Sequence, residues 1–161
     1  MGSDALFGLS ILMSFLAFGI VTRVFVWPRL RGMREADALL PLVIPHTFRF
    51  LGLSFLIPGV VSPSLSPTFT VPAAYGDLVA AVLADVATLT LAARAPWAIP
   101  IVWVFNVWGT VDLLHAVYQG QIGVGIDPGS LGATFFIPTV VVPLLLVTHG
   151  LIFWVLLRSK Q

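Results

Sequence analysis

The chain has 161 residues, of which 58% are hydrophobic and 9% are charged, with a formal net charge of +1 and no cysteine. A soluble domain carries about 25% charged residues, so this composition argues against water as the main solvent of the fold. The lack of cysteine excludes disulfides, thiolate metal sites and iron–sulfur clusters, and the small net charge offers no basis for nucleic-acid binding.

Five stretches are long and apolar enough to cross a bilayer, which takes about 20 mostly apolar residues. They cover about residues 5–27, 38–61, 73–93, 97–119 and 131–157. Backbone polar groups in lipid must bond within the protein, which favours helices. The sequence therefore predicts an all-α integral membrane bundle of five transmembrane helices, formed by a single transmembrane domain over residues 1–161.

Apart from Arg49, the basic residues lie in or next to alternate connections between these stretches. They are Arg23, Arg29, Arg31, Arg34, Arg94, Arg158 and Lys160. The connections at 62–76 and 120–130 contain no Lys or Arg. The positive-inside rule then predicts an N-terminus outside and a cytoplasmic C-terminus. We expect this orientation in a bacterial inner (cytoplasmic) membrane.

The start of the second stretch has two readings because of its prolines. Pro41 and Pro45 each remove a backbone donor and disfavour a helical residue before them. In one reading a kinked helix begins near Ala38, and in the other the span begins at Pro45. The first places Arg49 near the middle of the bilayer, about 16 Å along the helix.

Ionisable residues inside spans are costly, so they are candidate functional groups. Arg49, Asp85 and Asn106 are predicted to reach similar depths, which suggests an Arg49–Asp85 ion pair completed by Asn106. One interpretation is an anion or substrate site within the bundle. The alternatives are a structural ion pair between helices, or an Arg49 side chain that extends to the cytoplasmic surface.

Asp112, His115 and Gln119 follow i, i+3, i+7 spacing and share one face of the fourth stretch. A carboxylate near an imidazole can orient it, which suits a proton relay, a metal ligand or an acid–base pair. The alternative is a locally hydrogen-bonded pair near the outer surface.

His46 and His149 are predicted to lie at matching depth on two different helices. Two such histidines could be axial ligands of haem b in a haem- or quinone-linked redox protein. Helical histidines also commonly bond to a neighbouring carbonyl or side chain.

The leading functional interpretation is a binding or transport module for an ion, a small molecule or a lipid. Its candidate pocket residues are Arg49, Asp85, Asn106, Asp112, His115 and Gln119. A redox protein using His46 and His149 is one alternative. Another is an enzyme acting on a lipid or isoprenoid through Asp112 and His115. No metal-site motif occurs in the sequence. Five helices form a thin bundle, so the lipid bilayer and a further copy of the chain are the expected partners.

Overall fold

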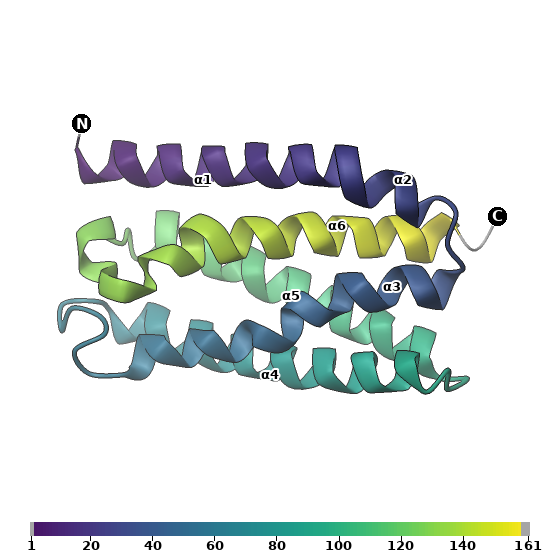
Figure 1. The fold of residues 1–161 in the computed structure, drawn as a ribbon. Helices are drawn as coiled ribbons and strands as arrows, with labels where there is room; N and C mark the ends of the chain where they lie inside the picture. The colour runs from purple at the N-terminus through teal and green to yellow at the C-terminus, as the bar shows by residue number, and fades with distance from the viewer. Residues whose placement is uncertain (1, 159–161) are drawn as a thin grey trace.

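The computed structural model describes residues 2–158 and contains five long helical runs packed side by side (Figure 1). Each is long and apolar enough to cross a membrane, which confirms the predicted all-α class with five apolar helices. The runs are Ser3–Leu30, Glu35–Leu56, Pro67–Ala92, Ala98–Gly123 and Ile137–Arg158. Lys160, used above for the charge of the tail, lies outside the described residues.

Successive helices alternate in direction, so the chain begins and ends at opposite ends of the bundle (Figure 1). We call these the N-terminal end, which holds the 57–66 loop, and the C-terminal end, which holds the 93–97 turn. Trp27 and Trp154 pack at the C-terminal end with ring centroids 4.3 Å apart, and the Arg158 guanidinium lies 4.3 Å above the Trp154 ring.

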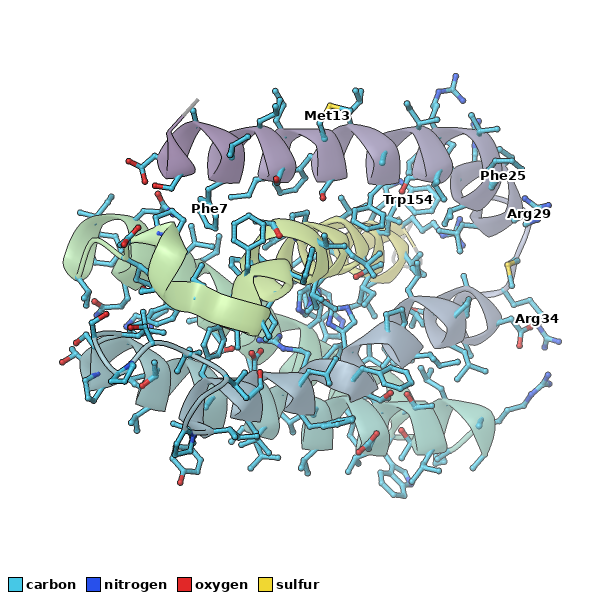
Figure 2. All side chains as sticks on the ribbon, turned by 60° about the vertical axis from the view of Figure 1, so that its left-hand side comes forward. Phe7, Met13, Phe25, Arg29, Arg34 and Trp154 are labelled. Atoms are coloured by element: carbon cyan, nitrogen blue, oxygen red, sulfur yellow. The ribbon has the colours of Figure 1, made fainter. Side chains whose placement is uncertain are left out.

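The first run is peripheral. It comprises α1 (Ser3–Val21), a π-helical segment η1 (Thr22–Val26) and α2 (Trp27–Leu30). Within α1, Phe7 is the buried residue, and it points toward the other helices, whereas Met13 points away (Figure 2). Most of α1 is therefore available to lipid.

The second run changes helix type halfway. It begins as α3 (Glu35–Val43), which contains Pro41, and continues as a 3₁₀ helix, η2 (Ile44–Leu56). The helical run therefore starts before Pro45. It begins three residues before Ala38, and it ends at Leu56 instead of residue 61. Runs of 3₁₀ helix longer than three or four residues are uncommon.

The 3₁₀ geometry of η2 determines which side chains face the bundle. With three residues per turn, side chains at i and i+3 lie directly above one another. The buried residues of η2 have this period of three: they are His46, Arg49, Gly52 and Phe55. The helix therefore directs an imidazole and a guanidinium from one face into the bundle.

Alanine lines the contact between the third run and its neighbours. This run is α4 (Pro67–Ala92), which packs against η2 and against α5 (Ala98–Tyr118). Ala80 and Ala84 are fully buried. Small side chains let helix backbones approach closely in membranes, so polar groups on these helices can meet directly.

The chain between α5 and α6 folds over the N-terminal end. It forms a π-helical turn, η3 (Gln119–Gly123), a 3₁₀ segment, η4 (Pro128–Phe135), and a second π-helical turn, η5 (Ile137–Val141), before α6 (Val142–Arg158). Two backbone bonds attach η4 to the 57–66 loop, from Ser62 N to Ser130 O (2.9 Å) and from Ala133 N to Val60 O (3.2 Å).

The core forms two apolar clusters near opposite ends. The cluster near the C-terminal end includes Leu39, Val43, Ala84, Ala87, Val102, Ile152 and Val155. The cluster near the N-terminal end includes Phe7, Phe55, Phe69, Ala73 and Leu131. Arg49, His46 and His149 are also buried. We call this group of buried polar side chains, together with their hydrogen-bond partners, the polar layer.

A substitution at Gly132 tests the contact between η4 and the 57–66 loop. Its φ is +53°, and a Cβ there would overlap the Val60 carbonyl oxygen. Gly125 has a similar φ of +67°, with open space at its Cβ position. Both Gly→Ala changes incur backbone strain of about 1–3 kcal/mol. We expect Gly132→Ala to lower the melting temperature in detergent clearly more than Gly125→Ala. Equal losses would show that the close approach contributes nothing.

Candidate functional site

The Arg49 guanidinium is the centre of the polar layer and is bound on all sides. Its Nε donates to Asp77 Oδ1 (2.8 Å), and its Nη2 donates to Asp112 Oδ2 (2.5 Å). Nη2 also lies 2.8 Å from Asp77 Oδ1, and Nη1 donates to the Gly109 carbonyl (3.1 Å). The guanidinium side chain is 0% exposed. One cation is thus shared by two carboxylates, one on α4 and one on α5.

Three glycines make room for these charged groups. A Cβ on Gly52 would overlap the Asp77 carboxylate, and one on Gly76 would overlap the Asp112 carboxylate. A Cβ on Gly109 would lie 2.9 Å from Arg49 Nη1. The helix backbones can approach the charged side chains because these positions carry no side chain.

The predicted pairing of Arg49 is wrong in its partners. The Asp85 side chain is exposed on α4, whereas Asp77, eight residues earlier, is buried. The predicted pairing rests on depth along the helix, but Asp85 lies on a different face of α4. The buried residues of α4 recur at spacings of three and four, and Asp77 lies on that face. Asn106 does not bond to Arg49, because its side chain is taken up by His149.

A second group of polar side chains lies beside the ion pair. His149 Nδ1 donates to Asn106 Oδ1 (2.6 Å), and a hydrogen bond of 2.9 Å joins His46 Nε2 and Thr148 Oγ1. The two imidazole rings are in contact, with centroids 4.2 Å apart. The predicted matching depth of the two histidines is therefore confirmed. Among residues 2–158, His46 Nδ1 and His149 Nε2 are buried without a hydrogen-bond partner.

The geometry of the two histidines does not fit haem b. Axial ligation needs the iron and its macrocycle between the two imidazoles. Rings that touch directly leave no space for them, and one nitrogen of each ring already bonds to a protein side chain. The contact is a structural one between η2 and α6.

Asp112 and His115 do not meet as an acid–base pair. The Asp112 carboxylate bonds to Arg49, whereas the exposed His115 bonds to Gln119 Nε2 at 3.4 Å. Gln119 thus contacts His115 and remains outside the Arg49 cluster. In residues 2–158, no group of three or more His, Asp or Glu side chains is arranged to hold a metal ion.

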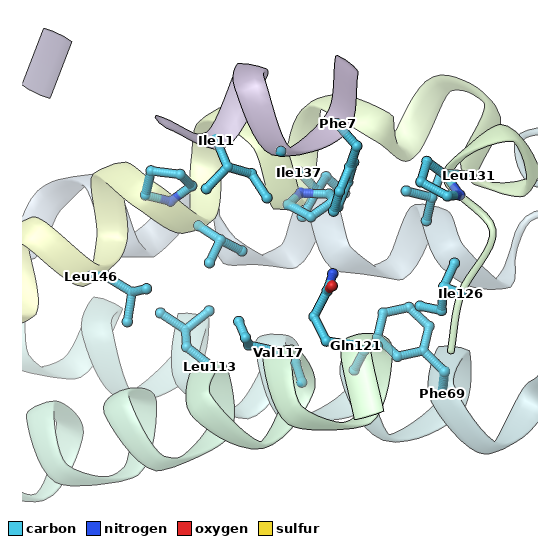
Figure 3. Close-up of a pocket in the computed structure, with 18 of the residues that line it drawn as sticks. Phe7, Ile11, Phe69, Leu113, Val117, Gln121, Ile126, Leu131, Ile137 and Leu146 are labelled. Atoms are coloured by element: carbon cyan, nitrogen blue, oxygen red, sulfur yellow. The ribbon is translucent and has the colours of Figure 1, made fainter. Parts of the chain in front are cut away.

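A cavity of about 500 Å³ opens next to the ion pair, toward the N-terminal end. Side chains from α1, η2, α4, α5 and the segment leading into α6 line it, and Leu113, Val117 and Gln121 face Phe7 and Ile11 across it (Figure 3). Asp77 is the member of the Arg49 cluster that reaches this cavity. The cavity therefore has mainly apolar walls that include the Asp77 carboxylate.

Sequence reasoning missed Asp77, Gly109 and the cavity itself. Asp77 could have been found from the buried period of α4. The Gly109 carbonyl carries no side-chain signal, and the cavity depends on how the peripheral α1 lies against the other helices.

Comparison with known proteins places the chain in a family. A family model described as a domain of unknown function, DUF8737, matches residues 6–157, which include most of all five helical runs. No curated protein and no solved structure matches the chain.

The sharing of one guanidinium by two carboxylates leads to a prediction about the stability of the protein. Arg49→Leu leaves two buried carboxylates unpaired, and losing one partner of a buried ion pair costs about 3–5 kcal/mol. We expect a loss of that order in the free energy of unfolding, measured by denaturant titration in bicelles. Adding Asp77→Asn and Asp112→Asn to Arg49→Leu should recover part of the loss.

Asp85→Asn is the matched control for these carboxylate changes. Asp85 is an exposed carboxylate on the same helix as Asp77 and has no contact with Arg49, so Asp85→Asn should not lower the free energy of unfolding, because it removes a charge inside a span. A large effect of Asp85→Asn, together with a harmless Arg49→Leu, would contradict the observed ion pair.

Proposed function

This chain belongs to the DUF8737 family, and we propose that it is an integral membrane protein that binds a small, mainly apolar molecule in the cavity beside Asp77. The observation that carries the proposal is a cavity of about 500 Å³ whose wall includes the buried Asp77 carboxylate. Ligand pockets commonly enclose about 300–1,000 Å³ and combine apolar walls with few polar groups.

The apolar walls of the cavity support a ligand that is largely hydrocarbon. Four phenylalanines from three helices line it: Phe7, Phe15, Phe55 and Phe69. Phe55 and Phe69 hold one another edge to face, with ring centroids 5.5 Å apart. Aromatic walls fixed in this way form a preformed surface for an apolar molecule.

The apolar cluster near the C-terminal end would block a ligand from entering the cavity from that end. Val43, Val102, Phe105 and Ile152 in that cluster are fully buried, so the polar layer meets tightly packed side chains in that direction. A molecule in the cavity would enter from the N-terminal end or from the bilayer. Release at the C-terminal end would need these helices to separate.

The proposed orientation places the C-terminal end in the cytoplasm. Arg29, Arg31, Arg34, Arg94 and Arg158 all lie near that end, as the positive-inside rule requires of a cytoplasmic face. The cavity would then belong to the outer half of a bacterial cytoplasmic membrane.

The chain lacks cysteine, so single cysteines can test this orientation. Ser64 and Met33 are exposed in connections at opposite ends of the bundle. In intact cells a membrane-impermeant maleimide should label Ser64→Cys, and it should label Met33→Cys only after permeabilisation. The reverse pattern would overturn the orientation.

A large side chain at Gly8 tests the cavity. Gly8 lines it, and a Cβ there meets no atom within 4 Å, so a phenylalanine can enter the space. We expect Gly8→Phe to weaken the binding of 1-methylnaphthalene by about tenfold, measured by equilibrium dialysis against nanodiscs that contain the protein.

Gly19→Phe is the control for that substitution. Gly19 lies about three turns further along the same face of α1, and its Cβ position is also open. It should bind the probe as the unmodified protein does. Equal uptake by all three proteins would mean that the probe only dissolves in lipid, and would rule out the proposed binding site.

A further inference from the structure

The charged groups around this cavity restrict the chemical class of ligand that it can bind. We propose that it is an organic cation, an amine or a quaternary ammonium on an apolar skeleton, whose positive end meets the Asp77 carboxylate. This inference rests on the proposed binding function and deepens it, because it names the chemical class that the same cavity would select.

The ion cluster has one carboxylate more than its guanidinium can balance. Arg49 is shared by Asp77 and Asp112, so the three groups sum to a formal charge of −1 when both acids are ionised. Both contacts between Asp77 and Arg49 use Oδ1 of the carboxylate. These contacts leave out the second oxygen, Oδ2, which lies against Gly52; a ligand in the cavity would share the carboxylate with Arg49. A cation there would balance the cluster in a medium of low dielectric constant.

The charged groups that reach the cavity have one sign. Among the described residues, the charged side chains that line it are Asp4, at the start of α1, and Asp77, from the Arg49 cluster. Arg49 is 0% exposed and bonds to Asp77 and Asp112. A ligand would therefore meet two carboxyl groups in the cavity wall and no guanidinium.

The aromatic walls favour the same class of ligand. The face of a phenyl ring attracts a cation within about 6 Å of its centroid. Phe15, Phe55 and Phe69 lie among the residues that surround the cavity. Quaternary ammonium groups are commonly bound by such rings.

An anionic ligand does not fit this arrangement, although Arg49 suggested one in the sequence. The Nε, Nη1 and Nη2 atoms of Arg49 all donate to protein oxygens. An anion would have to displace a carboxylate and would leave that carboxylate buried without a partner, which is costly.

Three probes of matched shape test the inference. They are naphthylmethyl-trimethylammonium, its neutral isostere with a tert-butyl group in place of trimethylammonium, and naphthylmethanesulfonate. Binding to nanodiscs is measured by equilibrium dialysis, with nanodiscs of Gly8→Phe subtracted to remove lipid partitioning. We expect the cation to bind at least about tenfold more tightly than the neutral isostere, and the anion to bind most weakly.

Asp77→Asn should bring the cation and its neutral isostere to within about twofold of each other, whereas Asp85→Asn should keep the tenfold difference. If the neutral probe binds specifically and as tightly as the cation in the unmodified protein, the cation inference is overturned and the binding function stands. If none of the probes binds specifically, both are overturned. The comparison of isosteres needs only the unmodified protein, so an unstable Asp77→Asn would not remove the test.

Discussion

The fold is organised around one guanidinium buried in a medium that cannot solvate it. Arg49 lies in the middle of the second helical run, where an unpaired charge would be expelled toward a membrane surface. It stays because two helices, α4 and α5, supply three acceptors, two of which are carboxyl groups. The same contacts hold η2 against α4 and α5. Each helix must therefore present a particular face at a particular depth, and the rest of the bundle follows from that requirement.

The backbone of η2 is adapted to this requirement. In an α-helix, the side chains at 46, 49, 52 and 55 would rotate steadily around the axis, because 3.6 residues make a turn. The 3₁₀ conformation places them in one row. His46 then reaches α6, Arg49 reaches the acids of α4 and α5, Gly52 admits Asp77, and Phe55 borders the cavity. One segment thus connects the tightly packed end of the bundle to its open end.

The sequence predicted the parts of this structure that depend on one helix at a time. Apolar length identified the five runs, and residue counting put His46 level with His149. The prediction was wrong where the rotation of a helix about its own axis decides the contact. Asp85 has the predicted depth, but its side chain is exposed, and Asp77 is the residue that pairs with Arg49. The burial of Ala80, Ala84 and Ala87 shows which face of α4 is packed, and Asp77 lies on it. The glycines and the Gly109 carbonyl carry no charge pattern, so contacts made through them could not be read from the sequence.

A buried ion pair is a poor source of stability, since apolar residues of similar volume often replace one at no loss. Two acids around one arginine are less favourable still, because one negative charge is left to be neutralised by a proton or by a cation. That residual charge lies on the wall of a cavity, where a ligand can reach it. Any cation that binds there stabilises the folded bundle by mass action. The feature that costs the fold stability is then the one that the proposed cation would bind.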